Sequence, residues 1–197
     1  EALARYGRLP LARVMAPAIR LAEEGVVVDT ALHRSLAQGQ RRIAQYAGAA
    51  VFHADGRAPA VGTRLRQPAL ARALRQIAAD GPDAFYRGWI ADSLVAEMRR
   101  GGGLITREDL ARYRPKWREP LRGTYRGHTL LAMPLASSGG VAVLELLNVL
   151  ERTPALPPFG STDGVHLLTE ALRRVFVDRS ARLGDPAFVQ VPVEELV

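Results

Sequence analysis

The sequence predicts an α+β fold that is predominantly helical and contains only small β pieces. Apolar residues recur at intervals of three and four along most of the chain, which is the period of an amphipathic helix. Residues 47–67 and 120–133 break that period and form short runs bounded by turn residues. The 197 residues, 48% of them hydrophobic and 24% charged, suffice for one domain with a sizeable core or for two small ones.

The first 67 residues are predicted to form two helices followed by irregular β structure. Apolar residues at helical spacing begin at Leu11, and Gly25 is a natural end for that helix. A weaker, arginine-rich helical pattern runs from about residue 31 to 46. Residues 47–67 are interpreted as short strands or an irregular hairpin, with Val51-Phe52-His53 and Gly62–Arg66 on either side of the turn Asp55-Gly56.

Three helices are predicted between residues 68 and 115. Pro68 suits the first turn of a helix, and residues 80–82 contain the Gly-Pro pair that ends it. The next helix has apolar residues four apart and stops at three consecutive glycines, residues 101–103. Thr106 and Asp109 resemble a capping box at the start of a short third helix, with Asp in place of the usual Glu.

The last third of the chain is predicted to contain one hairpin and two long helices. Residues 120–133 indicate a hairpin that turns at Arg126-Gly127. A helix then follows the loop and runs to about Arg152. The longest helix begins after the polar residues 161–163 and is stopped by Gly184-Asp185-Pro186.

The stretch MPLASSGGVAVLELLNVLE, Met133–Glu151, is compatible with three kinds of site. The first is a nucleophile turn, but Ser137 and Ser138 each have a glycine two residues after them and none two residues before. The second is a phosphate-binding loop, but the Gly-Lys-Ser/Thr ending is missing. A serine hydrolase that uses Ser138 therefore remains only an alternative.

The third reading, a capped helix start, needs the least from the sequence. A hydroxyl of Ser137 or Ser138 can accept a hydrogen bond from an amide of the first turn, which is worth about 1 kcal/mol against alanine. Gly139 and Gly140 lack a Cβ and so permit close approach of another backbone segment. We assign Pro134, Ser137, Ser138, Gly139 and Gly140 to a structural loop and helix cap.

Other polar residues do not form a recognisable catalytic or metal-binding set. The four histidines lie far apart: His33, His53, His128 and His166. His166 shares a helix side with Glu170, but two ligands do not define a metal site. The charged residues of 178–185 are interpreted either as a solvated helix end or as groups that brace a neighbouring segment.

Composition excludes several classes of protein. The formal net charge is +7, but only Lys116 of the 27 basic residues is lysine, and the arginines are scattered without a basic block. Nucleic-acid binding is therefore not expected. No apolar run approaches the roughly 18 residues of a membrane span, and the absence of cysteine excludes disulfides and thiolate catalysis.

Several short stretches occur in a fixed order along the chain. They are Tyr6–Pro10, Ala16–Ala18 with Leu21–Gly25, Gly81–Gly88, Gly102–Leu110, Tyr125–Gly127, Met133-Pro134 with Ser137–Gly140, and Asp178–Ser180 with Leu183–Val189. This ordered series resembles the large subunit of gamma-glutamyltranspeptidases across nearly the whole chain. Leu135-Ala136 stand where that family often has further prolines.

The resemblance implies a fold and a chemistry. Members of that family are made as one precursor that cuts itself into a large and a small subunit. The N-terminal threonine of the small subunit is the nucleophile, and its own amino group can serve as the base. The enzymes transfer a gamma-glutamyl group from glutathione and related amides to water or an amino acid, without a cofactor. The fold is a four-layered αββα sandwich of the N-terminal-nucleophile hydrolase type, and relatives include cephalosporin acylases and enzymes of poly-gamma-glutamate.

The resemblance also implies what to expect of this chain itself. Residues 1–197 correspond to the central to C-terminal part of a large subunit, with no separate second domain assigned. The nucleophilic threonine is expected downstream of Val197, and the arginine that holds the substrate α-carboxylate upstream of Glu1. No catalytic, substrate-binding or metal-binding residue is assigned here, so the segment alone is expected to be inactive.

Partners and location follow from the same resemblance. The expected partners are the small subunit of the same precursor and gamma-glutamyl substrates, with self-association of the segment where its subunit-facing surface is exposed. The family resemblance implies a periplasmic or secreted protein, although the sequence contains no signal-peptide pattern. The alternative is a non-catalytic helical module with a binding or scaffolding role.

Overall fold

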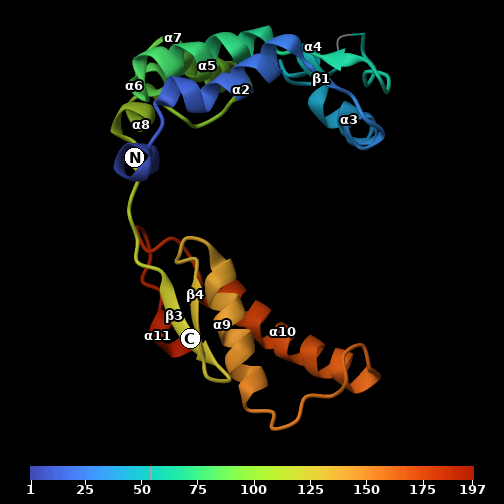
Figure 1. Ribbon diagram of the computed structural model, residues 1–197, viewed down its shortest axis with the longest axis vertical. Helices are drawn as coiled ribbons and strands as arrows, with labels where there is room; N and C mark the ends of the chain where they lie inside the picture. Colours follow the sequence, from blue (N-terminus) through green and yellow to red (C-terminus); the bar gives the residue numbers. More distant parts are fainter. Residues whose placement is uncertain (54) are drawn as a thin grey trace. The chain divides into compact units, whose positions relative to one another are not determined.

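The computed structural model describes residues 1–53 and 55–197, and the chain forms two compact units, Glu1–Pro115 and Lys116–Val197. Most of the helices and strands are labelled in Figure 1. The first unit contains α1 (Ala2–Tyr6), α2 (Leu11–Glu24), β1 (Val26–Val27), α3 (Thr30–Ile43), α4 (Ala49–Phe52), β2 (Arg64–Leu65), α5 (Pro68–Asp80), α6 (Asp83–Tyr86), α7 (Trp89–Gly101) and α8 (Arg107–Arg112). The second contains β3 (Leu121–Tyr125), β4 (His128–Ala132), α9 (Ser138–Glu151), α10 (Thr162–Arg182) and α11 (Val193–Leu196). The prediction of a predominantly helical α+β chain is confirmed.

Three helices of the first unit, α2, α5 and α7, end at glycines, as the sequence predicted. α2 stops before Gly25 and α5 before Gly81, and both glycines have positive φ angles, 84° and 79°. α7 stops before Gly102, which adopts the left-handed conformation with φ 70°. L-residues with a side chain rarely adopt such angles, so these glycines fix the helix boundaries.

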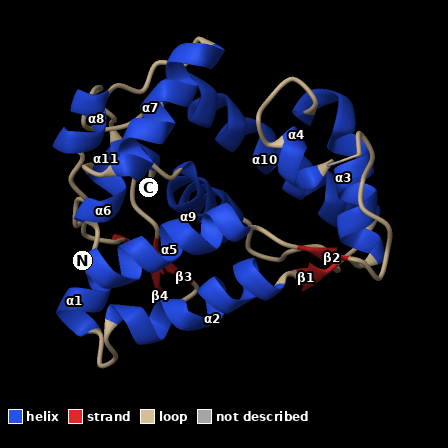
Figure 2. Ribbon diagram, turned by 90° about the horizontal axis from the view of Figure 1, so that it is seen from above, coloured by secondary structure: helices blue, strands red, loops and turns tan. Residues whose placement is uncertain are grey.

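α2 and α5 lie side by side and form the main helix pair of the first unit (Figure 2). The small residues Ala22 of α2 and Ala71 of α5 are both buried, which lets helices pack closely. The amide of Gln67, just before α5, donates to the carbonyl of Ala22 at 2.8 Å. A surface ion pair between Arg75 of α5 and Glu23 of α2 adds to this contact.

The region between α2 and α5 corrects one expectation from the sequence. Val51 and Phe52 lie in the short helix α4 and not in a strand, because the amide of Phe52 donates to the carbonyl of Gly48 at 3.0 Å. The only strand within residues 47–67 that the structure describes is β2, and it pairs antiparallel with β1, with Val26 opposite Leu65. The partner strand is thus far away in sequence, and the described residues of this region form no local hairpin.

Arg64 of β2 and the adjacent Arg66 bind the C-terminal end of α2. Arg64 donates from Nη1 to the carbonyl of Gly25 at 2.9 Å, and Arg66 donates from Nε to the carbonyl of Glu24 at 3.2 Å. The last carbonyls of a helix have no partner within it, so these two arginines satisfy them. A Cβ at Gly25 would lie 2.9 Å from the carbonyl oxygen of Leu65, which shows how closely the two segments approach.

The second unit is built from a β-hairpin and two helices. β3 and β4 pair antiparallel and turn at Arg126 and Gly127, whose φ angles of 47° and 81° are those of a tight hairpin turn. The hairpin packs on α9, because a Cβ at Gly123 would lie 2.7 Å from a methyl group of Leu144. Here the predicted hairpin and its turn are confirmed.

The core of this unit lies between α9 and its neighbours. Leu135, Val141 and Leu196 form one buried cluster, to which the C-terminal segment contributes through α11. On α10, Ala171 and Val175 are almost completely buried. None of the helices formed by the described residues is both long and apolar enough to cross a bilayer.

Candidate functional site

The loop before α9 is the motif from which the sequence raised the possibility of chemistry, and the structure gives its two serines different environments. Ser137 occupies the position before the helix, with φ −77° and ψ 120°. In the part of the chain that the structure describes, its hydroxyl accepts no hydrogen bond from the amides of α9. The expected side-chain cap is therefore wrong, although the helix begins where it was predicted.

The first turn of α9 makes tertiary contacts through its other residues. The hydroxyl of Ser138, the first residue of α9, accepts a hydrogen bond from Nε of Arg179 on α10 at 3.0 Å. The first turn is also covered by backbone, because a Cβ at Gly140 would overlap the carbonyl oxygen of Met133. A Cβ at Gly139 would meet only the Ser137 hydroxyl, at 3.8 Å. The close approach expected of both glycines thus occurs at Gly140.

The contact with Arg179 bears on whether Ser138 is a nucleophile. A serine nucleophile needs a neighbouring base that takes its proton. The guanidinium of Arg179 has only donors and stays protonated, so it cannot act as that base. The bond instead links α9 to α10.

The two histidines of the first unit, His33 and His53, make hydrogen bonds that hold segments of the fold together. His33 on α3 places Nδ1 2.9 Å from the carbonyl oxygen of Pro59, and His53 places Nε2 2.9 Å from that of Leu36. His53 is buried, and its Nδ1 has no hydrogen-bond partner among the described residues. Both rings tie the segment after α4 to α3. Across residues 1–53 and 55–197 there is no group of three or more side chains that could hold a metal ion.

The charged residues at the end of α10 brace neighbouring segments, which is one of the two readings of the sequence. Arg182 lies 3.7 Å from Asp178 and also pairs with Glu195 of α11. Asp185 pairs with Arg118 at 3.4 Å, and its carboxylate accepts the amide of Ala187 at 2.9 Å. These contacts fasten α11 and the entry to β3 onto the C-terminal end of α10.

One carboxyl group between α9 and α10 has unusual electrostatics. Burial raises the pKa of Glu145 most, and the hydrogen bond and the charge of Asp178 raise it further, to about 7. Arg182 acts in the opposite direction. Glu145 and Asp178 line the same open cavity of about 550 Å³, together with Glu170, Arg173 and other residues of α10.

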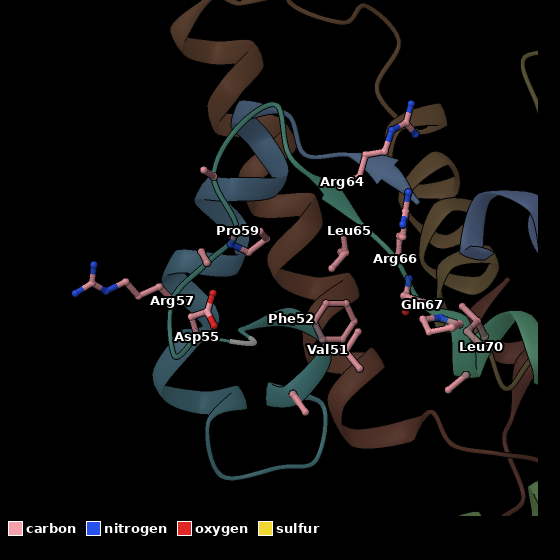
Figure 3. Close-up of a pocket in the computed structure, with 15 residues that line it drawn as sticks. Val51, Phe52, Asp55, Arg57, Pro59, Arg64, Leu65, Arg66, Gln67 and Leu70 are labelled. Carbon is pink, nitrogen blue, oxygen red and sulfur yellow. The ribbon is translucent and has the colours of Figure 1, made fainter. Parts of the chain in front are cut away.

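A cavity of about 870 Å³ lies in the first unit, between α4, β2 and the start of α5 (Figure 3). Val51, Phe52 and Leu65 form an apolar wall, whereas Arg57 extends away from them. Arg64 and Arg66, also part of the lining, are already bound to the end of α2. Sequence reasoning missed this cavity because its lining depends on how residues 50–70 fold around α4, β2 and the start of α5.

Comparisons with known proteins all point to one family and cover nearly the whole chain. The family model described as gamma-glutamyltranspeptidase matches residues 1–197. The acylase ACY 1 proenzyme of Pseudomonas sp. (strain SE83) is 47% identical over 100% of this chain and 36% of its own length. The glutathione hydrolase proenzyme of Escherichia coli (strain K12) is 41% identical over 99% of this chain and 34% of its own length. The chain thus spans about a third of the length of these relatives.

Solved structures agree with the fold. The gamma-glutamyltranspeptidase of Helicobacter pylori superposes with a TM-score of 0.93 at 36% identity, covering 99% of this chain and 57% of that one. The cephalosporin acylase of Bacillus halodurans gives a TM-score of 0.89 at 36% identity, over 98% of this chain and 37% of that one. The expectation that this chain is a segment of the N-terminal-nucleophile hydrolase type of fold is confirmed. The chain belongs to the gamma-glutamyltranspeptidase family.

Proposed function

We propose that this chain is the central to C-terminal part of the large subunit of an enzyme that transfers or hydrolyses gamma-glutamyl groups. The observation that carries the proposal is the family match over residues 1–197. The substrates are glutathione and related gamma-glutamyl amides, and the acceptor is water or an amino acid. Related chains named as glutathione hydrolase proenzymes support this substrate class.

In this proposal the nucleophile is a threonine outside these residues, and the segment alone is inactive. The environment of Ser138 supports this assignment, because its hydroxyl is bound to a guanidinium that cannot accept a proton. Ser137 and Ser138 then serve as part of the loop that begins α9. No residue of the chain is assigned a catalytic role.

The partner in this proposal is the small subunit of the same precursor. Relatives that are named proenzymes support it. Large apolar side chains remain exposed on α10, among them Val165, Phe176 and Val177, and they offer a surface for a subunit to cover. Expressed without that partner, the segment self-associates through such surfaces. The enzyme acts in the periplasm or outside the cell.

A cephalosporin acylase is the second candidate. The observation that favours it is sequence identity, because two Pseudomonas acylase proenzymes are 47% and 46% identical to this chain and the Escherichia coli glutathione hydrolase proenzyme is 41% identical. Both activities cleave an amide and need the same kind of nucleophile. A non-catalytic helical module is the third candidate.

The test is an assay of the complete gene product with two substrates. One is a gamma-glutamyl anilide, which releases a chromophore, and the other is a cephalosporin with an amide-linked side chain. We expect faster cleavage of the anilide. Preferential cleavage of the cephalosporin would identify an acylase, and no cleavage of either would favour the non-catalytic module.

The 197-residue chain alone at high concentration is the control for the position of the nucleophile. We expect it to release no chromophore. Turnover that persists after repurification would place the chemistry within these residues, and Ser138→Ala and Ser137→Ala would then show which hydroxyl is responsible.

A further inference from the structure

The β3–β4 hairpin packs one face on α9 (Figure 1), and its other face is exposed. Successive side chains of a strand point to opposite faces, and exposure alternates accordingly along β3 and from Thr129 to Met133. The strand register pairs Arg122 with Leu131 and Thr124 with Thr129, so these four side chains share the exposed face. Met133, which follows β4, continues the alternation. These five residues form the outer face of the hairpin.

The outer face combines apolar and basic side chains. Leu131 is 62% exposed and Met133 is 66% exposed, although both are large and apolar. Arg122 is exposed as well, and among the residues that the structure describes no acidic side chain forms an ion pair with it. None of the five residues of the outer face is acidic. A polypeptide that covers this face therefore complements it best with apolar side chains and a carboxylate.

Arg126, at the tip of the hairpin, adds a second positive charge beside the outer face. Its φ angle of 47° lies in the left-handed region, which no other described residue with a side chain adopts. Glycine and asparagine are the usual residues at this point of such a turn, because a larger side chain strains the backbone there. Glu151 of α9 holds the strained turn by accepting the backbone amide of Arg126 at 2.6 Å. Strain of this kind clusters at binding sites, which favours a binding role for the Arg126 side chain.

The guanidinium of Arg126 is available to bind an anion. Its Cζ atom lies 5.3 Å from the centre of the Tyr125 ring, within cation–π range. Glu151 binds the backbone amide of Arg126, and in the described part of the chain no acidic side chain forms an ion pair with the guanidinium. An acidic side chain is the group that fits, because a guanidinium and a carboxylate can pair through two parallel hydrogen bonds.

We propose that the outer face and Arg126 dock a segment of the same precursor from outside residues 1–197, whose acidic side chain pairs with Arg126 and whose apolar side chains cover Leu131 and Met133. This inference rests on the proposed function, in which the chain is one part of a longer proenzyme. Among the described residues β3 and β4 pair only with each other, and an isolated two-stranded sheet is marginally stable in water. The chain spans 36% and 34% of two proenzyme relatives, so in proteins of that length most of the polypeptide lies outside the matched region.

Carbodiimide cross-linking of the complete gene product is the direct test. Carbodiimide joins an amine to a carboxylate in contact with it and does not couple a guanidinium, so Arg126→Lys introduces a reactive group at the tip of the hairpin. Lys116 is the only lysine of residues 1–197, which keeps the background from this region low. We expect a new cross-link, located by mass spectrometry, from position 126 to an aspartate or glutamate outside these residues.

Arg34→Lys is the matched control, because Arg34 is exposed on α3 in the other unit. It should give no cross-link to the acidic residue that position 126 reaches, and a cross-link to that same residue would overturn the proposal. A cross-link from position 126 only to acidic residues within 1–197, such as Glu151 or those of a second copy, would also overturn it. So would the absence of any cross-link beyond those of the wild type.

Peroxide oxidation of Met133 in the complete gene product provides a second readout. The oxidation of a methionine to its sulfoxide depends on access to the sulfur, so a covered Met133 should react more slowly than in the denatured protein. Arg126→Gln removes the charge and should speed the oxidation of Met133 about threefold, which is the typical worth of an exposed ion pair. Arg126→Lys should restore the wild-type rate. Met98, in the other unit, should keep its rate in every variant and so reports general unfolding.

Two oxidation results would overturn the proposal. One is a wild-type Met133 that reacts as fast in the native protein as in denaturant, and the other is a rate that Arg126→Gln leaves unchanged. Neither readout needs turnover, so the docking face and the proposed function can fail separately. Cleavage of the gamma-glutamyl anilide without the cross-link would refute the docking face alone, and the cross-link without cleavage would refute the proposed activity alone.

Discussion

The starts of α8 and α9 form a useful comparison, because the sequence predicted a side-chain cap at both. At α8 the cap is complete: Thr106 Oγ1 accepts the amide of Asp109 at 3.1 Å, and Asp109 accepts the amide of Thr106 at 2.8 Å. At α9, Ser137 holds the corresponding position without such a bond in the described chain. The two helix starts therefore look alike in sequence and differ in structure.

The difference lies in what surrounds each helix start. The groups of the α8 cap are exposed and lie within four consecutive residues, so local sequence decides the outcome. The first turn of α9 is in contact with the backbone of Met133, and Arg179 binds the hydroxyl of Ser138. The surroundings of the α9 start are therefore set by contacts outside the local four-residue pattern. Capping rules are reliable where a helix starts in solvent and less so where it starts against another segment.

The largest effect is expected from Gly140→Ala. The new methyl group would overlap the carbonyl oxygen of Met133, which is backbone and cannot move aside easily. We expect the free energy of unfolding to fall by about 3 kcal/mol, as measured by chemical denaturation. Gly139→Ala is the control, because its Cβ would have only one neighbour, at 3.8 Å. Equal losses in the two variants would contradict the close approach at Gly140.

A smaller effect separates the two caps directly. Thr106→Ala removes both hydroxyl contacts of the capping box and should cost about 1 kcal/mol of unfolding free energy. Ser137→Ala removes no cap bond and should change stability by less than about 0.5 kcal/mol. Chemical denaturation of both variants under identical conditions measures the two losses of unfolding free energy. A loss of 1 kcal/mol in Ser137→Ala would show that the serine caps α9 after all.

The smallest effect concerns the hydrogen bond between Arg179 of α10 and Ser138 of α9. Arg179→Ala and Ser138→Ala each break the same hydrogen bond, so their effects should not add. A double-mutant cycle should give a coupling energy of about 0.5–1 kcal/mol, typical of a bond at an exposed site. Arg179 with Ser137→Ala is the control pair, for which we expect no coupling. Coupling of equal size in both cycles would rule out a bond specific to Ser138.

The elements predicted correctly are those whose signals are local. Gly25, Gly81 and Gly102 end their helices because glycine accepts the positive φ angle there. The β3–β4 hairpin turns at Arg126-Gly127 for the same reason. Such positions can be found from the local sequence, without knowing which distant residues pack against them.

The features that sequence reasoning missed depend on distant partners. β2 lies within the short strand predicted over Gly62–Arg66, but its pairing with β1 was not predicted, because β1 contains only two residues and lies far away in sequence. The α4 region was interpreted as a strand from its apolar residues, but His53 is drawn inward by the carbonyl of Leu36 on α3.

The pairing of β1 with β2 has a consequence for how the first unit tolerates change. The amide of Val28 donates to the carbonyl of Thr63, and the amide of Gly62 donates back to Val28, both at 2.8 Å. The chain between these residues thus leaves and re-enters the unit at one point, carrying α3 and α4 with it. The entropy of closing such a loop grows only slowly with its length. This segment can therefore gain or lose residues, or open by itself, while the α2–α5 pair stays intact.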